Sequence, residues 1–208
     1  MPDASTVALS IIETGRRLDS RGLAPATAGN YSARLDSGEI LITASGTHKG
    51  RLTEAQLMRV APDGTPIDAG KSSAETLLHC LVYAVDATVG AVLHTHSVAG
   101  TVLTRALAGS GGIELEGYEL LKVFPGVATH DARVVLPLVD NSQDMLALAA
   151  ELRPLLEAQE RLLPAFYIAG HGLYAWGPTI EAAENIVEGC EFLLACAWEE
   201  WKLKGAGR

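Results

Sequence analysis

The chain reads GAVLHTHS over residues 90–97, an apolar run that ends in two histidines separated by one residue. The apolar residues before the first histidine predict a buried β-strand. Side chains two positions apart on a strand point to the same face, so His94 and His96 should lie about 6–7 Å apart along it. Imidazoles at that spacing can converge on one divalent cation. The segment therefore predicts two metal ligands at the end of a strand.

A third ligand is expected from residues 170–172, which read GHG between two β-prone segments. The glycines on either side of His171 let the backbone approach closely. A catalytic zinc ion is typically held by about three protein ligands with one position left open. We therefore predict that His94, His96 and His171 together hold a divalent metal.

The other three histidines carry weaker information. His79 lies four residues after Glu75, which places the two on one face of a predicted helix, and we interpret them as a structural hydrogen-bonded pair. His48 and His130 lie in predicted loops and are interpreted as solvent-facing or loop-bound.

Helices and strands alternate outward from this segment. Hydrophobic periodicity predicts helices over 5–20, 72–85, 98–107, 143–156 and from 179 onward, with short helical turns at 53–57 and 116–122. Strands are predicted at 31–35, 39–43, 58–61, 89–96, 134–139, 166–169 and 173–176. The turn Asp36-Ser37-Gly38 joins the first two strands into a hairpin. The predicted fold is α/β, with a central, mostly antiparallel or mixed sheet flanked by helices on both faces, and residues 1–208 form one domain.

The last helix has the clearest apolar stripe. Its apolar residues recur at alternating intervals of three and four and are expected to face the core: Ile180, Ala183, Val187, Cys190, Leu194, Ala197 and Trp201.

The overall composition excludes several classes of protein. A chain of 208 residues with a net charge of −9 lacks the excess of basic residues that a nucleic-acid or anionic-membrane partner requires. Three scattered cysteines are too few for a disulfide framework and indicate buried thiols in a reducing compartment. The N-terminus has no secretory pattern, and no apolar run reaches the ~20 residues of a membrane span. The expected location is the cytoplasm.

Two loops rich in small residues are candidates for binding an anion. Residues 27–30 and 45–49 offer backbone amides and hydroxyl groups without bulky side chains, and Lys49 adds a positive charge. Ser72 and Ser73 lie at the predicted start of a helix, which favours negative charge. Neither loop matches a nucleotide-binding pattern, so ATP and NAD are not indicated.

Chemistry beside a metal-polarised carbonyl needs a general base. The glutamates nearest in sequence to the two strand histidines are Glu114, Glu116 and Glu119, and Glu75 lies in the preceding predicted helix. Spacing alone does not choose among these four residues.

Five segments together carry a family resemblance. They are PATAGNYSARL (25–35), TASGTHKG (43–50), SSAETLLH (72–79), AVLHTHS (91–97) and AGHGLYAWG (169–177). In this order they resemble the class II aldolase/adducin superfamily over nearly the whole chain. The resemblance implies one Zn²⁺ per subunit on His94, His96 and His171, and a small sugar phosphate as substrate. It implies that the phosphate is held by Asn30, Ser45, Gly46 and Ser73, beside Lys49. It also implies a homotetramer with sites between subunits.

Two further segments, LLKVFPG (120–126) and VLPLVDNSQD (135–144), resemble the branch of the superfamily that dehydrates a methylthio-substituted ribulose phosphate. That resemblance implies Glu119 as the catalytic acid/base. In the sugar-phosphate aldolases of the superfamily the base is the glutamate of the serine motif, where this chain has Glu75. Ala74 separates the serines from Glu75, which departs from the aldolase pattern and favours dehydration. The alternative is aldol cleavage of a fuculose or ribulose phosphate.

Overall fold

The computed structural model describes residues 4–158 and 163–206. Five α-helices are present in this part of the chain: α1 (Ala4–Ser20), α2 (Thr76–Val85), α3 (Val98–Ala106), α4 (Met145–Glu157) and α5 (Ile180–Ala206). The strands are β1 (Asn30–Arg34), β2 (Ile40–Thr43), β3 (Leu57–Val60), β4 (Ala91–Thr95), β5 (Gly112–Leu115), β6 (Val134–Val139), β7 (Ala165–Ile168) and β8 (Gly172–Gly177). Short 3₁₀ helices are η1 (Lys49–Arg51), η2 (Glu54–Gln56) and η3 (Glu119–Val123).

The strands form one eight-stranded sheet in the order β3-β2-β1-β4-β8-β7-β6-β5. All neighbouring strands pair antiparallel except β6 and β7, which pair parallel. The chain passes from β6 to β7 through α4, and a parallel pair needs such a crossover. The predicted mostly antiparallel, mixed sheet is confirmed.

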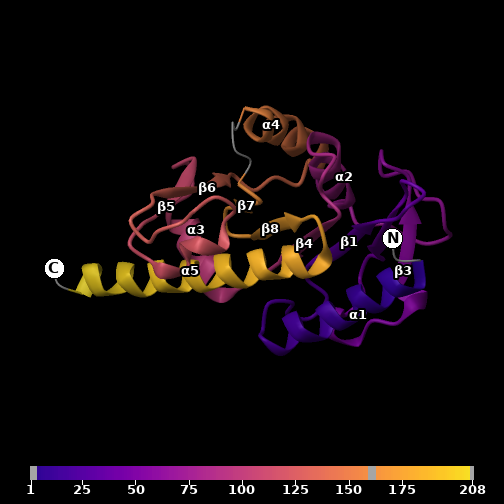
Figure 1. Ribbon diagram of the computed structural model, residues 1–208, viewed down its shortest axis with the longest axis horizontal. Coiled ribbons are helices and arrows are strands. Elements are labelled where there is room, and N and C mark those ends of the chain that lie inside the picture. Colours follow the sequence, from indigo (N-terminus) through magenta and orange to yellow (C-terminus); the bar gives the residue numbers. More distant parts are fainter. Residues whose placement is uncertain (1–3, 159–162, 207–208) are drawn as a thin grey trace.

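Helices cover both faces of the sheet (Figure 1). One core joins α1, α3 and α5 to one face, and a second joins α2 and α4 to the other. The alternation of side chains along β4 shows this division directly, because Leu93 packs in the first core and Val92 in the second. The predicted α/β fold with helices on both faces is therefore confirmed.

The central strand β4 aligns residues from three strands in one row. Asn30 of β1 lies opposite His94 on one side, and Tyr174 of β8 lies opposite it on the other. The turn between β7 and β8 therefore comes close to the end of β4. Gly29, with φ +78°, lies so close to β4 that a Cβ would be 2.5 Å from the His94 carbonyl oxygen, and only glycine fits there.

Several predicted boundaries are wrong. Helix α2 begins at Thr76 rather than at Ser72, because residues 73–76 form a turn in which the Thr76 amide donates to the Ser73 carbonyl at 3.1 Å. Ser73 is therefore not at a helix N-terminus. Helix α4 begins at Met145 rather than at 143, because Asp144 caps it: the Asp144 Oδ1 accepts bonds from the amides of the first turn at 3.0 and 3.1 Å.

Strand β5 is not among the strands predicted from the sequence, because only Ile113 and Leu115 are apolar in it and it lies at the edge of the sheet. The helical turn predicted at 116–122 is the 3₁₀ helix η3.

The last helix is longer than the core it covers. Ile180, Ala183, Val187, Cys190 and Leu194 are buried as predicted. Trp201, however, is 41% exposed, because the C-terminal turns of α5 run on past the strands (Figure 1).

All three cysteines are free thiols. Cys80 and Cys190 are buried as predicted, whereas Cys196 is partly exposed. Within residues 4–158 and 163–206, every helix is too short or too polar to span a bilayer.

Candidate active site

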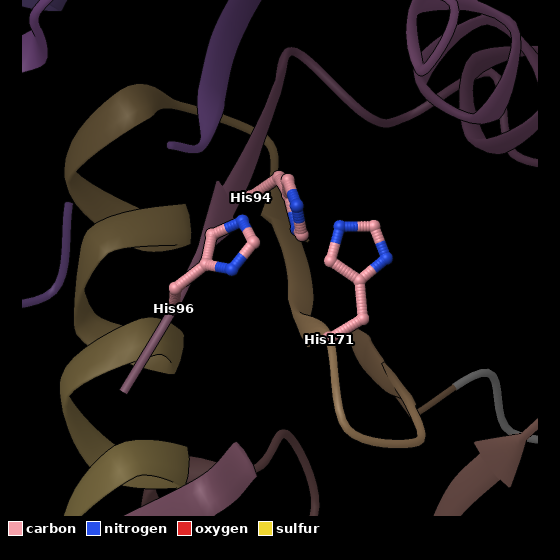
Figure 2. Close-up of side chains that lie close together, drawn as sticks. All are labelled: His94, His96 and His171. Atoms are coloured by element: carbon pink, nitrogen blue, oxygen red, sulfur yellow. The ribbon is translucent and has the colours of Figure 1, made fainter. Parts of the chain in front are cut away.

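The fold brings the three histidines named from the sequence into one cluster (Figure 2). His94 is in β4, His96 follows that strand, and His171 lies in the turn between β7 and β8. Their ring centroids are 4.6 to 5.1 Å apart, and one ring nitrogen from each lies within 4.8 Å of the others. Three imidazoles at these separations can hold a single ion.

The buried ring of His94 is held in one orientation. Its Nδ1–H donates to the Leu173 carbonyl at 2.9 Å, which leaves a lone pair on Nε2. The ring stacks on Tyr174 with centroids 4.1 Å apart. A Cβ at Gly172 would lie 2.6 Å from His94 Cε1, so glycine is required for β8 to pack here.

The histidine nitrogens fit a metal on two grounds. His94 Nε2 and His171 Nδ1 are buried without a hydrogen-bond partner among the described residues, a costly arrangement unless another group binds there. Burial also lowers the pKa of His94 well below its usual range and, with the nearby His171, lowers the pKa of His96 to about 4. Both rings are therefore neutral near pH 7, the form that binds metal.

Glu75 lies beside these rings. Its Oε1 is 2.9 Å from His171 Nε2 and 3.6 Å from His94 Nε2. Burial alone would raise the pKa of this carboxyl group, but the bond from His171 and the adjacent His94 bring it well below its usual range. Three nitrogen donors with an ionised carboxylate alongside suit zinc.

A chain of buried hydrogen bonds holds Glu75 from the other side. Asn30 Nδ2 donates to Glu75 Oε2 at 2.7 Å, and Asn30 Oδ1 pairs with His79 Nε2. His79 Nδ1 pairs with Ser32 Oγ at 2.7 Å, and Ser32 Oγ pairs with Tyr83 Oη at 2.9 Å. Glu75 and His79 are thus joined through Asn30, and not by the direct hydrogen bond predicted from their spacing.

A polar cavity of about 330 Å³ opens beside the histidines. The five residues predicted to hold a phosphate all line it, together with His96, His171 and Glu75: Asn30, Ser45, Gly46, Lys49 and Ser73. Segments that are distant in sequence thus share one cavity with the metal cluster.

Lys49 connects the two small-residue loops. Its side chain is buried, and its Nζ donates to the Thr27 carbonyl at 2.9 Å and the Thr47 carbonyl at 2.6 Å. Burial lowers its pKa to about 8, so most molecules keep the charge at pH 7. Lys49 therefore holds both loops in place as well as lining the cavity.

Sequence reasoning missed a second cavity, of about 550 Å³, that also reaches the histidines. Its lining includes His96, His171, Pro25, Val98 and Val102. The only sign of this cavity in the sequence is the pair of valines four residues apart on α3, and that spacing normally indicates a helix face packed against the core. Their exposure, 82% for Val98 and 39% for Val102, shows that they are not core.

Glu119 is not brought to the histidines within one chain. It begins η3, its side chain is 71% exposed, and it lines neither cavity described above. The hydrogen bond from Lys122 lowers the pKa of this carboxyl group, and His130 Nδ1 lies 3.7 Å away.

The buried histidines predict how stability depends on pH in the metal-free protein. Burial lowers the pKa of His79 to about 3 and that of His96 to about 4, whereas an unfolded histidine titrates near 6.5. As the pH falls below about 6.5, the unfolded chain takes up protons that the folded chain does not. With both rings contributing, the free energy of unfolding should fall on the order of 5 kcal/mol by pH 4.5. Urea unfolding with a chelator present measures it, and a level profile would show that these rings are not buried and neutral.

Comparisons with known proteins show which family the chain belongs to. The sequence model of the class II aldolase and adducin N-terminal domain matches residues 10–198. The methylthioribulose-1-phosphate dehydratase of Acidiphilium cryptum (strain JF-5) is 51% identical over 199 residues, covering 95% of this chain and 92% of that protein. The enzyme of the same name from Marinobacter nauticus is 46% identical, covering 96% of each.

Solved structures show the same fold. The L-fuculose-1-phosphate aldolase of Thermus thermophilus superposes with a TM-score of 0.77 at 24% identity, covering 97% of this chain and 98% of that one. A family match over most of the sequence and relatives near half identity lead to one conclusion. The chain belongs to the class II aldolase and adducin N-terminal domain family.

Proposed function

We propose that this protein dehydrates 5-methylthioribulose 1-phosphate to 5-methylthio-2,3-dioxopentyl phosphate, with one zinc ion on His94, His96 and His171. The observation that carries the proposal is the cluster of three imidazoles opening onto a polar cavity lined by both small-residue loops. Support also comes from relatives at 46% and 51% identity that are named methylthioribulose-1-phosphate dehydratase. The reaction belongs to methionine salvage.

The residues of the cavity have distinct roles in this proposal. Asn30, Ser45, Gly46, Lys49 and Ser73 hold the phosphate and so orient the substrate. When bound, zinc supplies a Lewis acid that makes the proton beside the substrate carbonyl more acidic. Glu119 removes the proton from C3 and passes a proton to the C4 hydroxyl, which leaves as water. The resulting enol becomes the 2,3-diketone.

Glu119 reaches the substrate in this proposal from a second copy of the chain. Its exposed side chain lines neither cavity of its own chain, and a site shared between subunits would bring it to the histidines of a neighbour. We propose a homotetramer in the cytoplasm, with residues 1–208 acting as one catalytic domain in each subunit.

A second candidate function is aldol cleavage, and the position of Glu75 favours it. Its carboxylate lies 2.9 Å from His171 Nε2 inside the cavity, where a base could take a proton from the substrate. In this alternative Glu75 is the catalytic base and the C3–C4 bond of a fuculose or ribulose phosphate breaks.

Product analysis separates the two functions. Zinc-loaded protein is incubated with 5-methylthioribulose 1-phosphate, with fuculose 1-phosphate as the control substrate, and products are identified by mass spectrometry and ³¹P NMR. We expect a diketone phosphate lighter than the first substrate by one water molecule, and no reaction of the second. Dihydroxyacetone phosphate plus an aldehyde from either substrate would instead establish the aldolase.

A further inference from the structure

The second cavity shares a wall with the polar one. His96 and His171 line both, so the metal cluster lies between a polar space of about 330 Å³ and a separate space of about 550 Å³. A molecule whose middle is held at the imidazoles therefore has room at both of its ends.

The two cavities differ in their chemistry. The polar one is lined by small residues, Lys49 and Glu75. The second has an apolar part, formed by Pro25 and the two valines of α3, and polar residues that include Asn141 and Gln143. Val98 and Val102 are one helical turn apart on the same face, and they are respectively 82% and 39% exposed. Exposed apolar side chains gathered beside a polar site indicate a surface that binds an apolar group.

The start of α3 holds these valines next to the metal cluster. Ser97, the residue after His96, caps the helix by accepting a bond from the Gly100 amide at 3.0 Å. The Thr101 hydroxyl donates to the His171 carbonyl at 3.4 Å, so its donor is already used by the protein. The position of Val98 is thus linked to that of His96 through a capped helix start.

We propose that this second cavity is the subsite for the apolar tail of the substrate, and that Val98 and Val102 select a thioether over a hydroxyl at C5. The inference rests on the proposed function. The phosphate is on C1 and the thioether on C5, so a substrate held with its C2 carbonyl at the imidazoles directs these groups to opposite sides. A thioether packs well against valine methyl groups. A hydroxyl placed against these two valines would lose bonds to water that their methyl groups cannot replace.

The test compares two substrates that differ only at C5. The specificity constant kcat/KM is measured for 5-methylthioribulose 1-phosphate and for ribulose 1-phosphate, with the wild-type protein and with Val98→Thr, Val102→Thr and the double variant. Valine and threonine have nearly the same volume, so the substitution exchanges a methyl group for a hydroxyl with little change of shape. We expect the preference for the thioether to fall about tenfold in the double variant, mainly through KM.

Two control variants accompany this comparison. Val102→Ile keeps the wall apolar and should retain the preference. Leu9→Thr changes a residue of α1 that is 52% exposed and lines neither cavity, and its preference should equal that of the wild type. Zinc content confirms that each metal site is intact.

The outcomes separate the subsite from the reaction. If the wild type dehydrates the thioether substrate and the double variant keeps the wild-type preference, the subsite assignment is wrong. If the wild type dehydrates neither substrate, the proposed function is wrong, and calorimetric binding of the same two sugar phosphates then decides about the subsite. Tighter wild-type binding of the thioether that is lost in the double variant supports it, and equal binding of both compounds overturns it.

Discussion

Replacing His96 by alanine is expected to give a folded protein that no longer retains zinc and has lost turnover by a factor on the order of a thousand or more. One of three nitrogen donors is removed, and the remaining pair, His94 and His171, leaves the ion with too few protein ligands. His96 is the best choice among the three because it is only partly buried and follows β4, whereas His94 is fully buried and stacked on Tyr174. Elemental analysis after dialysis, circular dichroism and steady-state kinetics measure the three effects.

His130→Ala is the control for metal content. This histidine is exposed and lies outside the cluster, so the variant should retain zinc at the wild-type level. Full zinc occupancy in His96→Ala would show that these three imidazoles do not form the metal site, and the proposed function would lose its basis.

Mixing two inactive variants is expected to restore activity if the site is shared between copies. Glu119→Gln alone should bind zinc and lack turnover, because the amide cannot accept the C3 proton. His96→Ala alone should lack zinc. In a mixed assembly, a Glu119→Gln chain keeps its metal ligands and can receive an intact Glu119 from a neighbouring His96→Ala chain. Random assembly of equal amounts in a symmetric ring should recover about a quarter of the wild-type activity.

A second mixture provides the matched control. Glu75 and His96 line the same cavity of one chain, so the mixture of Glu75→Gln with His96→Ala should show no activity beyond the sum of its components. Turnover that remains high in Glu119→Gln alone would remove Glu119 from the mechanism. An inactive Glu119→Gln chain that gains nothing from mixing would place Glu119 at the site of its own chain.

The metal cluster could be predicted because its signals are local. The two-residue period of a strand places His94 and His96 on one face, and the glycines around His171 indicate a close backbone approach. The structure brings these three residues together. The loops of the polar cavity were also recognisable, because small polar residues without apolar neighbours cannot form core.

The remaining parts of the site depend on long-range packing. The hydrogen bond from Asn30 to Glu75 joins strand β1 to the turn before α2. These two segments are far apart in the sequence, so no local pattern predicts that they meet. Val98 and Val102 have the spacing of a core stripe, and only their exposure distinguishes them. The exposed position of Glu119 likewise follows from how η3 packs rather than from its neighbours in sequence.

The row formed by Asn30, His94 and Tyr174 has a consequence for how this scaffold tolerates change. The hydrogen-bond ladder of three adjacent strands sets the spacing between the ligand His94 and Asn30, which orients Glu75. Insertions in the distant hairpin at 36–38 lengthen a connection without altering that ladder. The surface of the protein can therefore diversify, or be engineered with added peptide segments, while the atoms that do the chemistry keep their separations.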